Sequence, residues 1–298
     1  MYVNTVLALP EELNFIPELR SIEHDGKSLP TSIGQKIVRD DTNEVLGIVK
    51  SKYHPEPYSA LWNPLVEGLE ASDLDLSDAQ VSWRVMNNGA RMFADITLRN
   101  YDYDKIVGEP TALALRVYNS VDGSLAYNVS AFIRRLACLN GMTSVGDNVS
   151  ATFKHTVGTD PMKIGHVASS WPTALEKDAH LFNHMKGIHL ERNDVQNFFT
   201  KHLCFTHMKS GMKVNESWLN KMMGLFDTYR STIGNNCYAL YNAITHFGTH
   251  VDQDRLRGAE LGNRALRQEK SVQSLVRGLP FKNLIQYEEF EQLSGQVA

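Results

Sequence analysis

Apolar and polar residues alternate in four stretches of the chain, at residues 80–86, 91–99, 111–118 and 149–157. A period of two residues places alternate side chains on opposite faces, so each stretch predicts a strand with one buried face. The first two stretches flank Asn87-Asn88-Gly89, residue types that tolerate a positive φ and favour a hairpin turn. We therefore expect an antiparallel sheet in the middle of the chain.

Between the third and fourth stretches the apolar residues change to a helical spacing. Over residues 125–139 they form one stripe of Val129, Phe132, Ile133 and Leu136. The following Asn-Gly pair at 140–141 is typical of a helix C-terminus. The order of hairpin, strand, helix and strand predicts an α+β fold, with this helix lying across the antiparallel sheet.

The chain divides into three regions by pattern. Residues 1–75 form an acidic segment with a predicted hairpin around residues 40–43 and a short helix at 59–70. Residues 76–170 form the α+β core. Residues 171–298 are mostly helical, with helices expected at 173–190, 193–208, 215–232, 235–247 and 252–277, separated at Gly211, Gly234 and Gly248.

Composition narrows the class of protein. The 298 residues are 42% hydrophobic and 21% charged, which excludes a disordered or fibrous chain. The sequence has no apolar run long enough for a transmembrane helix, and its N-terminus does not resemble a secretory signal. Its three cysteines, Cys138, Cys204 and Cys237, form no CxxC pair, which favours a reducing cytoplasm over a disulfide framework or a zinc ribbon.

Charge is unevenly distributed along the chain. Residues 1–80 carry 6 basic against 14 acidic residues, whereas residues 81–298 carry 24 against 20. A net charge of −4 disfavours a protein that coats duplex nucleic acid. Because local charge governs the binding of polyanions, the part after residue 80 is where such a site is expected.

Motifs for catalysis are lacking. The sequence has no phosphate-binding GxxxxGK[ST] loop, no GxSxG elbow and no HExxH motif, so we expect no enzyme activity and no cofactor. Histidines at helical i, i+4 spacing, His180 with His184 and His246 with His250, could share a metal. Without a carboxylate at fixed spacing, the interpretation as ordinary helix-surface residues is favoured, and no metal site is predicted.

The outward face of the predicted sheet carries cations mixed with aromatic rings. Its residues are Arg84, Arg91, Phe93, Arg99, Arg116, Tyr118 and Lys154, and the predicted helix adds Arg134 and Arg135. Cations bind phosphates and rings stack on bases, which is the combination that single-stranded nucleic acid requires. The alternative is an ordinary solvated face.

Three stretches carry a resemblance to a known family: VRDDTNEVLGIVKSKYHPEPY, RVYNSVDGSLAYNVSAFIRRLACLNGM and YNAITHFGTHV. They resemble the phage- and plasmid-borne family known as domain of unknown function 932, or the phage/plasmid-like protein family, over residues 37–276. Its most specific parts here are residues 39–42, the turn at 119–123 and Leu139-Asn140-Gly141. Where the family has an acidic-aromatic pair, this chain has His246-Phe247.

The resemblance implies a mobile-element origin, among genes of replication, recombination and anti-restriction. The order of the core elements is similar to that of phage single-strand annealing proteins, which bind single-stranded DNA and assemble without ATP. We therefore expect a phage-encoded, non-enzymatic protein that binds single-stranded DNA in the bacterial cytoplasm. The alternative is a host-takeover or anti-defence protein that binds a bacterial protein through its acidic N-terminal part. A metal-dependent enzyme that uses the histidine pairs is a third hypothesis.

Scattered cations on an acidic chain give one subunit few phosphate contacts, so a homo-oligomer is expected to supply the rest. Met222, Met223, Leu225 and Phe226 are candidates for burial against a neighbouring subunit. The alternative is that these residues pack inside the helical region.

Overall fold

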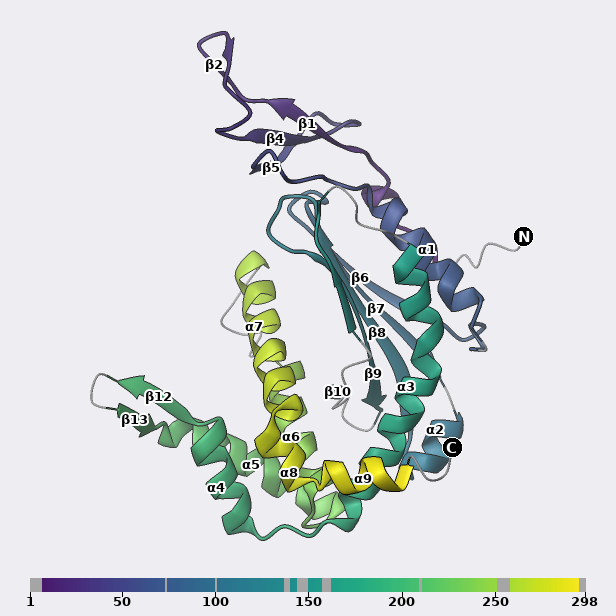
Figure 1. The fold of residues 1–298 in the computed structure, drawn as a ribbon, viewed down its shortest axis with the longest axis vertical. Helices are drawn as coiled ribbons and strands as arrows, with labels where there is room; N and C mark the ends of the chain where they lie inside the picture. Colours follow the sequence, from purple (N-terminus) through teal and green to yellow (C-terminus); the bar gives the residue numbers. More distant parts are fainter. Residues whose placement is uncertain are drawn as a thin grey trace. The chain divides into compact units, whose positions relative to one another are not determined.

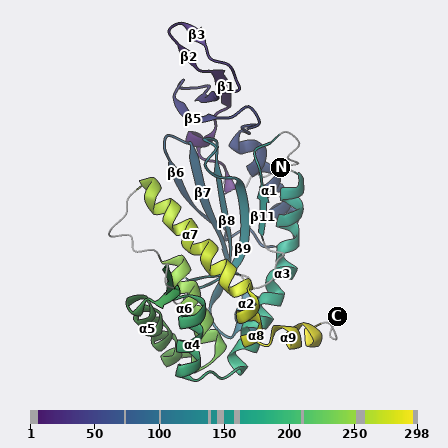
Figure 2. The same cartoon turned by 60° about the vertical axis from the view of Figure 1, so that its left-hand side comes forward.

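The computed structural model describes residues 7–72, 74–99, 101–136, 140–143, 150–156, 162–208, 211–250 and 258–294. It confirms the α+β class, with antiparallel sheets and a mostly helical C-terminal region (Figures 1 and 2). The chain forms two compact units. The first contains residues 1–99, 113–131 and 148–174, and the second contains residues 100–112, 132–147 and 175–298.

The first unit holds a small three-stranded sheet and most of the large sheet. The small sheet has the order β1-β4-β5, formed by Pro17–Ser21, Gln35–Arg39 and Val45–Val49. The large sheet has the order β10-β9-β8-β7-β6, and β11 also pairs with β9. Its strands are β6 (Gln80–Met86), β7 (Arg91–Arg99), β8 (Thr111–Ser120), β9 (Tyr127–Arg135), β10 (Asn140–Thr143) and β11 (Ser150–Phe153). The first unit also contains three short elements. Two strands of two residues each, β2 (Glu23–His24) and β3 (Lys27–Ser28), pair with each other, and η2 (Glu11–Leu13) is a 3-10 helix.

The hairpin between β6 and β7 confirms the turn predicted at Asn87-Asn88-Gly89. All three residues have positive φ, at 53°, 55° and 89°. Met86 pairs with Arg91, and the amide of Ala90 donates to the carbonyl of Asn87 at 3.0 Å. The left-handed conformation explains why Asn and Gly occupy the turn, since most residues are strained there.

Helix α1 (Tyr58–Glu70) covers the apolar face of the large sheet (Figure 1). The rings of Trp62 and Trp83 lie 4.5 Å apart between centroids, and the Trp62 indole donates to the carbonyl of Leu7 at 2.8 Å. The sheet contributes Met92, Ala94, Ile96 and Leu98 to this core. Gly68 of α1 packs directly on the backbone of Gly165, in the first part of α3 (Met162–Gly187).

The prediction of a helix over residues 125–139 is wrong. Residues 127–135 form strand β9, and Asn140-Gly141 belongs to strand β10 rather than to a helix C-terminus. Strand β9 is buried on both faces, so its apolar residues do not alternate. Helix α1 and the first part of α3 lie against the sheet (Figure 2), and α6 (Cys237–Thr249) packs on its edge strand β10.

The second unit contains strand β10, one end each of β8 and β9, the remaining helices and a hairpin. Its helices are α2 (Tyr101–Val107), the second part of α3, α4 (Arg192–His202), α5 (Glu216–Ile233), α6 (Cys237–Thr249), α7 (Gly258–Arg277), α8 (Leu279–Leu284) and α9 (Tyr287–Ser294). The predicted helix at 193–208 is too long, because residues 205–208 form strand β12 and pair with β13 (Gly211–Val214). Asn215 and Asn236 cap α5 and α6 through their side chains.

A buried charge cluster helps to hold the second unit together. The Glu109 carboxylate accepts from the Arg135 guanidinium and from the Tyr238 hydroxyl, the latter at 2.6 Å. Met222, Met223 and Phe226 are buried within the chain, as in the alternative that these residues pack inside the helical region, and Leu225 is half-buried.

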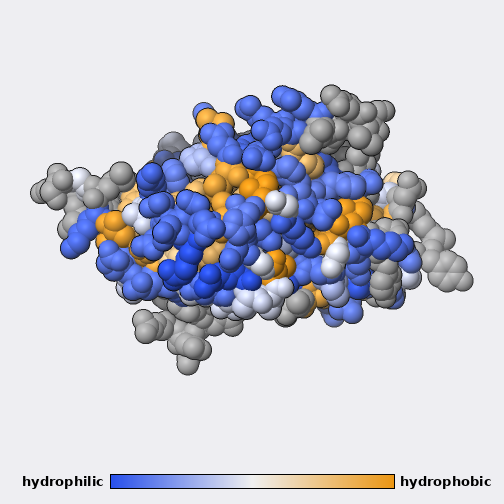
Figure 3. Space-filling view, turned by 90° about the horizontal axis from the view of Figure 1, so that it is seen from below, coloured by the Kyte–Doolittle hydropathy of each residue, from blue (hydrophilic) through white to orange (hydrophobic). Residues whose placement is uncertain are grey.

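No helix within the described ranges is both long and apolar enough to cross a membrane. On the face shown in Figure 3, apolar patches are small and separated by hydrophilic side chains.

Candidate nucleic-acid interface

The polar face of the large sheet is built by the register of its strands. Arg84 pairs with Phe93, and Met86 with Arg91, so these side chains share one face of β6 and β7. Strand β8 extends this face, because Arg116 bonds to Asp95 and Tyr118 contacts Phe93. We call this surface the polar face and define it by Arg84, Arg91, Phe93, Asp95, Arg99, Arg116 and Tyr118.

A cation and two rings form a row across the polar face. The Arg84 guanidinium lies 5.5 Å from the centroid of the Phe93 ring, and the Phe93 and Tyr118 centroids are 6.1 Å apart. Arg84 is exposed and Phe93 is half-buried, whereas Tyr118 is only 9% exposed. Phe93 therefore offers the more accessible ring, and Tyr118 supports it.

Two arginines of the polar face already have carboxylate partners. Arg91 binds Asp122 at 2.8 Å, and Arg116 binds Asp95 at 2.8 and 3.2 Å. Burial disfavours the charge of Asp122, but hydrogen bonds from Ser124 and Arg91 outweigh it and hold its pKa below the ordinary value. At neutral pH these pairs reduce the positive charge that the face presents.

The other predicted binding residues lie in different places. Arg99 shares the polar face, at the end of β7. Arg134 and Arg135 are neighbours on strand β9, not on a helix, and therefore point to opposite faces. Arg134 lies over the Phe132 ring at 5.8 Å, while Arg135 is paired with Glu109 and buried. Lys154 follows β11 and is exposed. The structure thus brings together the residues of β6, β7 and β8, whereas Arg135 lies in a buried ion pair and Lys154 lies after β11.

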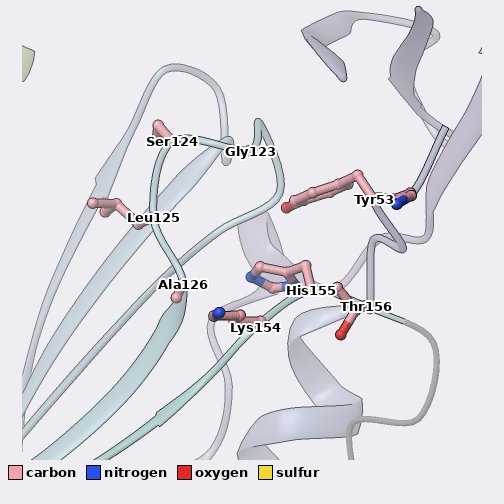
Figure 4. A pocket seen from close by; sticks show the side chains of 9 residues that line it. Tyr53, Gly123, Ser124, Leu125, Ala126, Lys154, His155 and Thr156 are labelled. Atoms are coloured by element: carbon pink, nitrogen blue, oxygen red, sulfur yellow. The ribbon is translucent and has the colours of Figure 1, made fainter. Parts of the chain in front are cut away.

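A pocket of about 330 Å³ lies beside the β8–β9 turn in the same unit (Figure 4). Three segments line it. They contribute Lys52 and Tyr53, then Gly123, Ser124, Leu125 and Ala126, and finally Lys154, His155 and Thr156. Sequence reasoning missed this pocket, because its segments are far apart along the chain. One feature of the sequence could have indicated it: two of the three segments lie in the stretches that resemble the family.

Hydrogen bonds fix the two rings of the pocket. His155 is buried, and its Nε2 lies 2.7 Å from Oδ1 of Asn119. The Tyr53 hydroxyl donates to the carbonyl of Ser120 at 3.0 Å, and the Tyr53 and His155 centroids are 5.1 Å apart. Burial lowers the pKa of His155 to about 4 and raises the pKa of Tyr53. Both side chains are therefore neutral at pH 7.

The turn at residues 119–123 joins the pocket to the polar face. Asn119 holds His155, and the Ser120 hydroxyl bonds to the backbone of Leu125. Asp122 binds Arg91, on the polar face. Gly123 has a φ of 80°, and a side chain there would lie 2.8 Å from Cγ1 of Val49. Each named residue of this turn thus has a structural role.

The stability of the protein is expected to depend on His155 between pH 6.5 and pH 4. An unfolded chain gains a proton near the ordinary pKa of 6.5, whereas the folded chain stays neutral there until about pH 4. Stability is therefore lost as the pH falls through this window, by on the order of 3 kcal/mol for a shift of this size. Unfolding by urea at pH 7, 5.5 and 4 measures the effect. His155→Gln should show a smaller loss, and His24→Gln, at an exposed site, the same loss as the unchanged protein. Equal pH dependence in all three proteins would contradict the role of His155.

One histidine of each i, i+4 pair is hydrogen-bonded to another part of the protein. His184 bonds to the carbonyl of Ile285, and His180 is exposed. His246 bonds to the Tyr229 hydroxyl at 2.8 Å, while His250 lies beyond the end of α6. Burial, and then His250 and Lys221, lower the pKa of His246 to about 4. Among the residues that the structure describes, no group of three or more His, Cys, Asp or Glu could hold a metal ion.

The cysteines that the structure describes are buried thiols. Cys204 and Cys237 are free, and burial raises the pKa of each to about 12. Such thiols are poor nucleophiles, because the reactive form is the thiolate. Cys138 and Leu139 lie outside the described residues.

Fold and site together define an α+β protein whose helix-backed antiparallel sheet leaves a mixed cationic and aromatic face. The family described as "Domain of unknown function (DUF932)" matches residues 45–277, and the chain belongs to this family. The match begins after Arg39-Asp40-Asp41-Thr42 and includes the polar face and the pocket. No curated protein and no solved structure matches the chain.

Proposed function

We propose that the protein is a phage-encoded, ATP-independent single-stranded-DNA-binding protein of recombination and replication. It acts in strand annealing as a homo-oligomer in the cytoplasm of the bacterial host, with no catalytic activity of its own. The observation that carries the proposal is the row of Arg84, Phe93 and Tyr118 on the polar face. An exposed guanidinium beside an accessible ring suits a phosphate next to a stacked base.

The ion pairs of the polar face refine this proposal. Because Arg91 and Arg116 are paired with Asp122 and Asp95, the exposed Arg84 is the main candidate for a phosphate contact. Few contacts per subunit imply weak binding by one chain. Side-by-side subunits would place several polar faces along one strand and so raise the affinity without new contacts.

Binding of a fluorescent single-stranded oligonucleotide is expected to depend on salt and on Phe93. Each phosphate contact contributes about −0.7 to the slope of log affinity against log salt. Loss of one stacked base in Phe93→Ala should weaken binding by about 5- to 150-fold, equivalent to about 1–3 kcal/mol. Fluorescence anisotropy at several salt concentrations measures both.

The matched control is Lys213→Ala, which removes an exposed cation on β13, outside the polar face. It should bind like the unchanged protein, whereas Arg84→Ala should reduce the salt slope. No binding at low salt would refute the proposal. If Phe93→Ala and the unchanged protein bind the oligonucleotide equally well, the DNA does not bind at the polar face.

One observation favours the second candidate, a host-takeover or anti-defence protein that binds a bacterial protein. The small sheet exposes Val45 and Ile48, which are 57% and 66% exposed, and the turn before β4 exposes Ile33, which is 61% exposed. They lie in the acidic first 80 residues, and β5 is an edge strand. Apolar residues beside acidic ones on a strand edge suit a protein partner. The oligonucleotide assay separates the candidates, since this one requires no binding to DNA.

A further inference from the structure

The pocket beside the β8–β9 turn is chemically distinct from the polar face. Of the predicted DNA-binding residues, only Lys154 lines it. Its other residues have no part in the proposed strand binding, so it needs a separate explanation.

The lining of the pocket favours an anion. Lys52 and Lys154 are exposed, and they approach from different segments, one before α1 and the other after β11. The described residues that line it include no carboxylate, and Thr156 adds a hydroxyl group. The nearby Asp122 is directed to Arg91 and Ser124. Two ammonium groups suit a phosphate, which lysine binds as a point charge.

The remaining walls favour a flat, partly apolar group. Tyr53 and His155 contribute rings, and Leu125 and Ala126 contribute aliphatic surface. Figure 4 shows the Tyr53 and His155 rings on one side of the pocket, opposite the segment from Ser124 to Ala126. Both rings are held by hydrogen bonds before any ligand arrives, so little ordering cost remains for binding.

A hydrogen bond also fixes the tautomer of the His155 ring. Oδ1 of Asn119 accepts from the amide of Ser120 at 2.8 Å, so the proton between Asn119 and His155 belongs to Nε2 of the histidine. The ring is therefore held in one orientation and adds no charge to the pocket at neutral pH.

We propose that this pocket binds one nucleotide, with its phosphate at Lys52 and Lys154 and its base against the rings of Tyr53 and His155. The volume of about 330 Å³ is at the low end of the range for small-molecule pockets, about 300–1,000 Å³, which suits one nucleotide rather than several. The nucleotide is either free or the end of a strand, and both have the same chemistry.

Titration calorimetry of the full-length protein with deoxyadenosine 5′-monophosphate tests the proposal. We expect binding by the monophosphate, and much weaker binding by deoxyadenosine and by inorganic phosphate alone. Lys52→Ala removes an exposed cation and should weaken binding about 10-fold.

A second variant and a control accompany it. Ala126→Phe fills the pocket and should abolish binding, while Lys213→Ala should have no effect. Lys52→Ala keeps the test decisive if Ala126→Phe does not fold. No binding at millimolar nucleotide, or binding that neither pocket variant changes, would overturn the proposal.

Competition with oligonucleotides identifies the source of the nucleotide. A 5′-phosphorylated oligonucleotide that displaces the monophosphate, when the unphosphorylated one does not, indicates a strand end. If neither displaces it, the site serves free nucleotide. Phe93→Ala separates this site from the proposed strand binding, because it should weaken oligonucleotide binding to the polar face and leave binding of the monophosphate unchanged. Failure of one proposal is thus distinguishable from failure of the other.

Discussion

Replacement of Arg39 by leucine is expected to destabilise the first unit by about 3 kcal/mol. The guanidinium bonds to both carboxylate oxygens of Asp41, at 2.9 and 2.7 Å, and to the carbonyls of Glu12 and Asn88, at 3.2 and 2.7 Å. It also lies 4.0 Å from the centroid of the Phe15 ring. Loss of this side chain removes the donor to the carbonyls of Glu12 and Asn88 and breaks the connection between the small sheet and the β6–β7 turn.

The planar fork of arginine is what this site requires. Lysine carries one point charge and cannot bind both oxygens of Asp41 while reaching two carbonyls, so Arg39→Lys should recover only part of the stability. The hydrogen bond from Arg39, together with its charge, lowers the pKa of Asp41 to about 2, so the pair stays charged in mildly acidic solution.

Guanidinium unfolding followed by circular dichroism measures the change. Arg20→Leu is the matched control, because Arg20 lies on the same sheet and pairs with Glu18 at the surface, where both side chains are more than 40% exposed. Its loss should cost less than about 1 kcal/mol. Equal effects of the two substitutions would contradict the role of Arg39 as a buried connector.

The parts of the fold that the sequence predicts correctly are those in which one face of an element is buried. Strands β6 and β7 alternate cleanly, because α1 covers one face and the other stays polar. Their turn was predictable because only a few residue types adopt positive φ in succession. A side chain on Gly89 would also lie 2.7 Å from the Arg39 guanidinium, a long-range contact that local pattern does not contain.

Alternation of apolar and polar residues does not predict strand β9. A strand buried on both faces has no alternation, and Val129, Phe132 and Ile133 then match a helical spacing by coincidence. Their β-branched and aromatic side chains favour a strand, but we predicted a helix because the spacing of the apolar residues is helical. The error also placed Arg134 and Arg135 together on one helix, whereas a strand separates them.

The residues of the polar face were predictable from the sequence, but their partners from distant segments were not. Its residues follow from alternation, including the carboxylate of Asp95, which lies on the same face as Arg116. The partner of Arg91 is Asp122, in a turn 31 positions away, and only the fold brings the two together. The pocket depends even more on the fold, because Tyr53, Asn119 and His155 come from three distant segments.

Gly68→Ala is expected to be among the most damaging small substitutions in the first unit. A Cβ atom at Gly68 would collide with the carbonyl oxygen of Gly165 and lie 2.6 Å from its Cα. These are backbone atoms, which cannot rotate away as the end of a flexible side chain can. Helices α1 and α3 would have to move apart and loosen the core around Trp62, at a cost of about 3 kcal/mol.

Gly224→Ala is the control, since a Cβ at Gly224 in α5 meets no atom within 4 Å. There the higher helix propensity of alanine should raise stability by up to about 1 kcal/mol. The same guanidinium unfolding measures both variants. If Gly68→Ala lowers the free energy of unfolding and Gly224→Ala raises it, then contact with Gly165, rather than the intrinsic helix preference of alanine, determines the effect at Gly68. A neutral or stabilising Gly68→Ala would mean that α1 and α3 do not pack this closely. The apolar support beneath the polar face would then need a different description.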